Sequence, residues 1–235
     1  MMQRFGAVSA GGGGGGGDDP YWASVVSLLN FPGTDGSTAI VDAKGKTWTA
    51  YGDAQIDTSL GYNTCQFDGA GDYIETPHSA DFVFGTGDFT IEGIDIINAF
   101  GADPQALWEK RSTGFTTGDL IVYSMPDGGF NIYAYDYSTG ALFSNSGLAT
   151  AGVPFHWAWT RSGTTMRFWF NGALISSVTT SASLVSASTP VTIGKDNAGG
   201  GRFWVNGRCR ARRVTKGVCR YTAAFTPPAA PFPVA

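Results

Sequence analysis

Two carboxylates in the segment EGIDII, residues 92–97, are the first candidates for chemistry in this 235-residue chain. Two carboxyl groups about 5–5.5 Å apart in one cleft can cleave a glycosidic bond as nucleophile and general acid. Glu92 and Asp95 are three residues apart, so on a strand their side chains point to opposite faces. Ile94 and Ile96 occupy the positions where a same-face partner of Glu92 would stand. With only three glutamates in the chain, little remains from which to build such a pair.

The other groups that could catalyse a reaction or hold a metal form no known pattern. His78 lies in a turn-like segment, and His156 lies in an aromatic run where we expect a structural histidine. The chain contains no Gly-x-Ser-x-Gly nucleophile elbow and no cluster with metal-ligand spacing. Cys65, Cys209 and Cys219 are expected to be reduced, although a bridge between the last two is an alternative. We therefore expect no enzyme activity, no catalytic residue, no metal ligand and no cofactor.

Aromatic and arginine side chains are candidates for binding rather than catalysis. Exposed aromatic rings can stack on sugar faces, and strand parity gives five candidates for contact with a glycan: Trp169, Trp204, Tyr133, Tyr135 and Tyr137. Arg208, Arg210 and Arg212 alternate along the chain, so we expect them to share one face, with Cys209 and Ala211 turned to the other. Because the arginine fork donates two parallel hydrogen bonds to a carboxylate or phosphate, this face predicts an anionic partner.

Charge is distributed unevenly along the sequence. Residues 1–194 contain 7 Lys and Arg against 18 Asp and Glu, whereas residues 195–235 contain 8 against 1. Two interpretations are open: the basic segment pairs with the acidic body of the same chain, or it contacts a neighbouring subunit or an acidic glycan. A net charge of −4 and the lack of a nucleic-acid motif argue against nucleic acid. The absence of a run of 18 apolar residues argues against a membrane span.

Strands must position these groups. Runs of aromatic and β-branched residues bounded by Gly, Asp, Asn or Ser predict strands over 46–51, 73–76, 88–97, 120–125, 130–136, 191–194 and 203–215. No segment has its apolar residues at helical spacing, and 34 glycines suit many tight turns. The sequence therefore predicts an all-β fold, an antiparallel two-sheet jelly-roll sandwich.

A three-strand meander is the clearest local prediction, over residues 155–180. Ser162-Gly163 and Asn171-Gly172 each separate two alternating runs, and Asn-Gly readily takes the two positive-φ positions of a type I′ turn. Parity then places three apolar side chains on one face of the middle strand and two other side chains on the opposite face. The first set is Met166, Phe168 and Phe170, and the second is Arg167 and Trp169.

Four blocks of sequence carry a family resemblance: LLNFPGTDGSTAIVDAKGKTWTAY, FDGAGDYIETPHSADFVFGTGDFTIEG, RSGTTMRFWFNGALISS and RVTKGVCRYTAAFTPPAAPFP. In this order they resemble the concanavalin A-like, laminin-G-type jelly rolls of structural proteins of tailed bacteriophages, over about Asp19 to Pro233. The resemblance implies a lectin-like sandwich in a virion protein of the capsid decoration, tail or fibre. The chain departs from the family pattern at Arg210-Ala211, where an acidic pair is common. We therefore expect no cofactor, with a calcium ion held by loop carboxylates as the alternative.

The first 17 residues are expected to form an arm. Gly11 to Gly17 resist helix and strand formation and suit a flexible linker ahead of a jelly-roll domain over 18–235 with a Pro-rich tail. We expect Phe5, Ala7 and Val8 to dock on another virion protein, and closed symmetry, with a trimer as one candidate, to order the arms. No secretory signal is recognised, so the predicted location is the virion, after synthesis in a host cytoplasm without export. The alternatives are an adhesin for host-surface glycans and, less favoured, a glycoside hydrolase.

Overall fold

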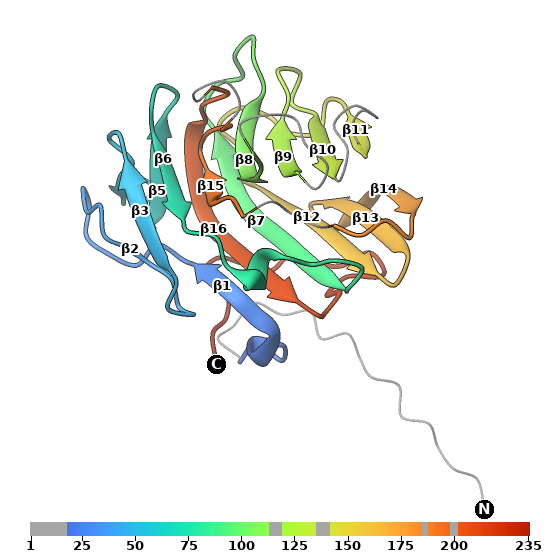
Figure 1. Cartoon of the computed structure of the whole chain (residues 1–235). Helices are drawn as coiled ribbons and strands as arrows, with labels where there is room; N and C mark the ends of the chain where they lie inside the picture. The colour runs from blue at the N-terminus through green and yellow to red at the C-terminus, as the bar shows by residue number, and fades with distance from the viewer. Residues whose placement is uncertain (1–17, 113–118, 135–141, 185–187, 198–201) are drawn as a thin grey trace, which may run out of the picture.

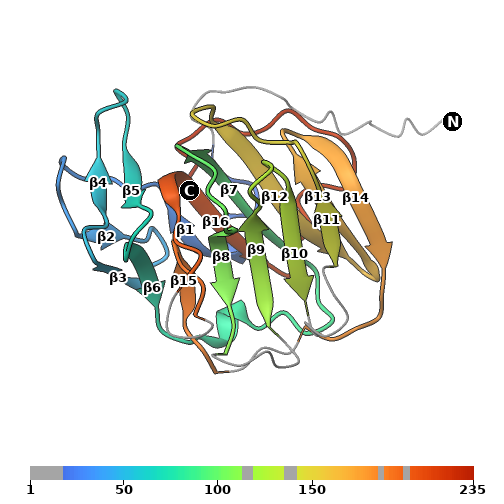
Figure 2. The ribbon, with the colours of Figure 1, turned by 90° about the horizontal axis from the view of Figure 1, so that it is seen from above.

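Two antiparallel sheets packed face to face make up the computed structural model, which describes residues 18–112, 119–134, 142–184, 188–197 and 202–235 (Figures 1 and 2). The first sheet has the order β14-β13-β12-β7-β16-β5-β4, and β1 pairs with β16. The second sheet has the order β11-β10-β9-β8-β15-β6-β3-β2. The predicted all-β, two-sheet sandwich is confirmed.

The strands are numbered in chain order and are divided between the two sheets. The first sheet contains β1 (Val25–Leu29), β4 (Gln55–Asp57), β5 (Thr64–Asp68), β7 (Phe89–Ile97), β12 (Phe155–Ser162), β13 (Thr165–Phe170), β14 (Ala173–Thr179) and β16 (Asn206–Lys216). The second contains β2 (Ile40–Val41), β3 (Thr47–Tyr51), β6 (Tyr73–Thr76), β8 (Gln105–Lys110), β9 (Leu120–Ser124), β10 (Phe130–Ala134), β11 (Phe143–Asn145) and β15 (Val191–Ile193). The part of the chain that the structure describes also contains two 3-10 helices, η1 (Trp22–Ser24) and η2 (Ala80–Phe82). Within the described ranges, no helix is long and apolar enough to span a membrane.

The predicted meander is confirmed as β12, β13 and β14. Asn171 and Gly172 have φ of 47° and 79°, the two positive values that a type I′ turn requires. Met166, Phe168 and Phe170 lie in the main core between the sheets, as parity predicts. This core is continuous and contains aromatic side chains from both sheets, so it fixes the sheets against each other.

The C-terminal segment 217–235 packs on the outer face of the first sheet, over β1, β7 and β16. Phe232 is buried there, in a small cluster with Val25, Leu28, Ile94 and Ala211. The side-chain amide of Asn30 donates to Phe232 O and accepts from Phe232 N, both at 2.9 Å. These contacts hold the tail on the sheet.

Under this cover lies a buried ionic network centred on Glu92. Arg213 Nε donates to Glu92 Oε1 at 2.9 Å, and Tyr221 Oη donates to Oε2 at 2.8 Å. His156 Nε2 lies 3.0 Å from Oε2. Arg213 and Arg220 also bind the carboxylate of Asp19. The basic C-terminal segment thus pairs with the acidic body of its own chain, the first of the two interpretations of the charge pattern.

Asp95 lies on the opposite face of β7, in the sandwich interior, as the three-residue spacing from Glu92 predicts. Arg212 Nη2 donates to both Asp95 oxygens at 2.9 Å and to Leu107 O of the second sheet at 3.2 Å. Trp157 Nε1 donates to Asp95 Oδ2 at 2.6 Å. Both carboxylates on β7 are therefore buried in structural contacts on different faces.

The prediction that Arg208, Arg210 and Arg212 share one face is wrong. A β-bulge in β16 between Cys209 and Ala211 adds one residue opposite β7, and this inverts the alternation beyond it. Arg212 consequently points inward to Asp95, whereas Cys209 lies in the main core and Ala211 in the outer cluster. All three cysteines are free, so the alternative disulfide is absent.

Candidate functional site

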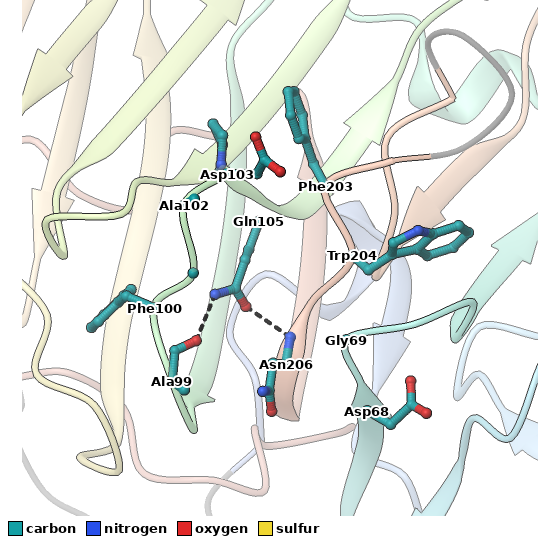
Figure 3. A pocket seen from close by; sticks show the side chains of 12 residues that line it. Asp68, Gly69, Ala99, Phe100, Ala102, Asp103, Gln105, Phe203, Trp204 and Asn206 are labelled. Carbon is teal, nitrogen blue, oxygen red and sulfur yellow. Dashed lines mark hydrogen bonds between the residues drawn. The ribbon is translucent and has the colours of Figure 1, made fainter.

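Three segments meet at one end of the sandwich and enclose a depression of about 290 Å³, the rim pocket. They are the turn between β5 and β6, the loop between β7 and β8, and the segment 202–206 that leads into β16 (Figure 3). Its lining includes Asp68, Asp103, Gln105, Phe203, Trp204 and Asn206. The pocket therefore combines aromatic rings with carboxylate and amide groups.

Gln105 holds two walls of the rim pocket together. Its Nε2 donates to Ala99 O, and its Oε1 accepts from Asn206 N, both at 2.8 Å (Figure 3). Ala106 N donates to Phe203 O at 2.9 Å and adds a second tie between β8 and the segment before β16. The Gln105 side chain is buried, so these bonds fix the loop backbone without solvent competition.

A close approach at Gly69 joins the third wall. Gly69 has φ of +90°, and a Cβ there would lie 3.1 Å from Asn206 Cβ. Only glycine fits this turn without strain. Beside it, Asp68 Oδ1 accepts from Ala70 N at 2.7 Å, so this carboxylate stabilises its own turn. Asp103 is exposed, and its carboxylate makes no hydrogen bond or ion pair within the described residues.

An aromatic strip runs from the rim pocket across the outer face of the second sheet. It consists of Tyr51, Tyr73 and Trp204. Tyr51 and Tyr73 are cross-strand partners on β3 and β6, and their rings stack with centroids 4.4 Å apart and an interplanar angle of 5°. Trp204 lies 6.0 Å from Tyr73 at 42°. Tyr51 is 39% exposed, and Lys195 Nζ lies 3.6 Å from the centre of the Tyr73 ring. The strip offers ring faces and edges next to polar groups.

The five aromatic residues predicted from parity have different locations. Trp204 is half-buried and lines the rim pocket. Tyr133 is also half-buried, packs edge-on against Tyr123 at 5.8 Å and does not line that pocket. Tyr135 and Tyr137 lie outside the described residues, as do Phe5, Ala7 and Val8 of the predicted arm.

The prediction that Trp169 contacts a glycan is wrong. Parity places it correctly on the outer face, but the side chain is fully buried. Its Nε1 donates to Thr160 Oγ1 at 3.0 Å, and Phe225 of the C-terminal segment packs over it at 5.6 Å. The alternation of one strand carries no information about a distant segment that later covers its outer face.

Two further buried carboxylates belong to the second sheet and its loops: Glu109 is on β8, and Asp196 follows β15. Asp196 accepts from Arg111 Nη1 at 3.0 Å and from the Tyr123 hydroxyl. Glu109 Oε1 accepts from Thr192 Oγ1 and Asn197 N, both at 2.8 Å, whereas Oε2 is buried without a partner. Burial and the nearby Asp196 raise the pKa of Glu109 well above 4.5. Both carboxylates are fully buried, so they are closed to a substrate in this structure.

Potential ligands for metals are dispersed. Within the described ranges, no three His, Cys, Asp or Glu side chains are arranged to hold an ion. Loop aspartates instead bind backbone groups: Asp72 accepts from Asp53 N and Asp68 N, and Asp88 accepts from Gly163 N.

Sequence reasoning found Trp204 but missed the remainder of the site. Tyr51 and Tyr73 end and begin segments that the sequence predicts as strands, yet nothing in the sequence gives their pairing. Asp103, Gln105 and Asn206 follow no motif, because they converge only when the loops of three distant segments fold together. A signal was present in one place: Gly69, in a turn flanked by aspartates, indicates a tight turn at the pocket wall.

Solved structures with the same fold include binding domains of bacterial toxins. A botulinum neurotoxin type C structure, described by the dependence of cell entry on two ganglioside molecules, is 12% identical at a TM-score of 0.62, covering 84% of this chain and 49% of that one. The binding domain of Paraclostridial Mosquitocidal Protein 1 is 14% identical at 0.59, covering 88% and 50%. The chain thus spans about half the length of these structures.

A third structure matches over nearly its whole length. Domain 4 of AbnA, an extracellular GH43 arabinanase from Geobacillus stearothermophilus, solved with arabinotriose, is 14% identical at a TM-score of 0.59, covering 83% of this chain and 94% of that one. No curated protein matches the sequence. Residues 68–213, more than half of the chain, match the family described as the concanavalin A-like lectin/glucanases superfamily. The chain therefore belongs to the concanavalin A-like lectin/glucanase superfamily.

Proposed function

We propose that this domain binds a neutral glycan, without cleaving it, at the rim pocket and the aromatic strip. The observation that carries the proposal is the continuity of Trp204 with both features: it lines the pocket and it ends the strip. Apolar sugar faces stack on aromatic rings, and sugar hydroxyls need nearby acceptors and donors. Asp103 and the Asn206 amide supply such groups in the pocket.

The walls of the pocket are prearranged for binding. Gln105 fixes the two loops through two buried hydrogen bonds, so little ordering of backbone is needed when a ligand binds. The similar structures support the proposal at the level of fold. One is the binding domain of a toxin, one is a neurotoxin structure described by an interaction with gangliosides, and one contains arabinotriose.

The positions of the carboxylates support the proposal that the domain does not hydrolyse the glycan. Glu92 and Asp95 lie on opposite faces of β7 and are held by arginines, and Glu109 is buried. Asp68 and Asp103 both line the rim pocket, but Asp68 accepts a hydrogen bond from Ala70 N of its own turn. Of these two, only Asp103 is then left to act on a bound glycan, whereas a glycosidase uses a pair of carboxyl groups.

A virion role is the wider setting that we propose, and it rests on the sequence blocks alone. One structural observation supports this setting: the first described residues and the proposed glycan site lie on opposite outer faces of the sandwich. Asp19 lies in the ionic network on the outer face of the first sheet, whereas Tyr51 and Tyr73 are on the outer face of the second. An arm that docks through Phe5, Ala7 and Val8 would leave the opposite face open to a host glycan.

Trp204→Ala tests the glycan site. Screening an array of neutral oligosaccharides that includes arabinotriose identifies a ligand, and calorimetry measures its affinity for each variant. We expect Trp204→Ala to weaken binding about two- to tenfold, because a lost stacking contact costs about 0.5–1.5 kcal/mol. Tyr73→Ala is expected to act in the same direction.

Tyr21→Ala is the matched control, since Tyr21 is 41% exposed but lies near Arg220 on the other side of the molecule. Equal affinity of the Trp204→Ala variant and the unmodified protein would refute the site. Release of reducing ends from the ligand would refute the non-catalytic assignment.

A further inference from the structure

A second pocket lies between the C-terminal tail and the loops next to β1 and β5. This tail pocket has a volume of about 420 Å³. Its lining includes Pro32, Tyr62, Asn63, Arg210 and Pro231. It shares no lining residue with the rim pocket, so an inference about it is independent of the proposed glycan site.

Arg210 is placed in the tail pocket by the β-bulge of β16. The extra residue breaks the ladder at Arg210 and directs its guanidinium over the ring of Tyr62, at 3.8 Å from the ring centre. Its Nη2 donates to Ala230 O at 3.3 Å. These two contacts fix the plane of the guanidinium.

The neighbouring arginines of β16 all have a carboxylate partner. Arg208 pairs with Asp57, Arg212 with Asp95, and Arg213 with Asp19 and Glu92. Within the described ranges, no carboxylate lies within 4.0 Å of the Arg210 guanidinium, and its Nε and Nη1 donate to no protein group. A half-buried guanidinium without a counterion favours one negative charge from outside.

The other walls of the tail pocket suit a small ring that carries hydroxyls. Asn63 Nδ2 donates to Phe31 O at 2.9 Å and to Gly33 O at 2.8 Å, which fixes the amide. Asn63 Oδ1 accepts no hydrogen bond from the described residues and can therefore accept one from a ligand hydroxyl. Pro32 and Pro231 supply apolar surface for the CH groups of a ring.

We propose that the tail pocket binds a monosaccharide unit that carries a carboxylate, with Arg210 as the carboxylate-binding residue. A single guanidinium matches a single negative charge, which favours a carboxylate over a doubly charged phosphate. The volume lies in the range of pockets that enclose small molecules.

Calorimetry with three small probes tests the ligand class. The methyl glycoside of glucuronic acid is expected to bind, and its neutral methyl ester at least tenfold more weakly. Acetate is expected to bind at least tenfold more weakly than the glycoside, because it lacks the ring. Equal affinity of the ester would overturn the role of the carboxylate, and equal affinity of acetate would overturn the role of the sugar ring.

Variants locate the site on the protein. Arg210→Met is expected to lower the affinity for the glucuronoside at least tenfold, and Arg210→Lys is expected to restore only part of it, since lysine lacks the planar fork. Trp204→Ala is expected to leave glucuronoside binding unchanged, which separates this proposal from the rim-pocket proposal. A melting curve for each variant checks the fold. Full affinity in a folded Arg210→Met variant would overturn the proposal.

Discussion

Glu92 and Glu109 are both fully buried glutamates, but their surroundings place their pKa values on opposite sides of the usual one. Arg213, His156 and Arg220 hold the pKa of Glu92 far below 4.5 despite its burial. At Glu109, burial and the neighbouring Asp196 raise the pKa well above 4.5. The two residues therefore contribute to stability in opposite ways as the pH changes.

Glu109→Gln is expected to change the pH dependence of stability. The folded state holds a proton on Glu109 that the unfolded state releases near pH 4.5, so the contribution of this group is fully present below pH 4.5. It is lost at about 1.4 kcal/mol per pH unit as the pH rises toward the folded pKa. The free energy of unfolding of the Gln variant should therefore rise relative to that of the unmodified protein as the pH increases above 4.5, as measured by urea unfolding.

Glu92→Gln provides the contrast of opposite sign. The lowered pKa contributes stability above pH 4.5 that is lost as the pH falls. The free energy of unfolding of this variant should therefore be lower than that of the unmodified protein by about 3–5 kcal/mol at pH 7, and by less at low pH.

For the Glu109→Gln variant, the contradicting outcome is a free energy of unfolding that changes with pH in parallel with that of the unmodified protein. That result would show that Glu109 is ionised in the folded state.

At the level of elements, the β7–β16 pair depends on one small residue. Gly93 faces Arg212 across the ladder, and a Cβ on Gly93 would lie 1.7 Å from Arg212 Nη1. The guanidinium occupies the space beside the Gly93 backbone, and this position brings it to Asp95. Glycine is thus needed at position 93 to leave space for the buried ion pair, and not to allow an unusual backbone conformation.

Gly93→Ala is expected to displace Arg212 from Asp95 and to destabilise the protein by about 3–5 kcal/mol, because a buried charge then loses its partner. Denaturant unfolding measures the loss. Gly101→Ala is the control, since its nearest non-neighbour atom lies 4.0 Å from the added Cβ. If both variants unfold at the same denaturant concentration as the unmodified protein, the packing argument fails.

Strand periodicity predicts most elements but not their irregularities. The segments 46–51, 73–76 and 88–97 coincide with β3, β6 and β7 to within one residue. Short strands with weak alternation, such as β5 (Thr64–Asp68), are absent from the sequence prediction. The face of Arg212 could not be predicted, because a bulge depends on the two partner strands and leaves no pattern in β16 itself.

For the whole molecule, the sequence predicts the sandwich and offers internal charge pairing as one of two interpretations, but it does not predict the location of the ligand sites. Both pockets join segments far apart in the chain: the rim pocket brings Asp68 to Asn206, and the tail pocket brings Asn63 to Arg210. Such contacts depend on sheet order, which alternation does not encode. Trp169 failed as a surface candidate for the same reason, since Phe225 covers it from 56 positions further along.

The backbone hydrogen bond from Asp19 N to Val234 O, at 3.0 Å, brings two distant parts of the chain together. A short linker could therefore join residues 19 and 234 covalently while new ends open elsewhere. Gly163, in the tight turn between β12 and β13, is exposed and has no other group within 4 Å of an added Cβ. A circular permutant opened there is expected to keep its glycan affinity and a cooperative melting transition, both measurable on the purified protein. If the order of segments along the chain were itself required for folding, the permutant would be recovered unfolded.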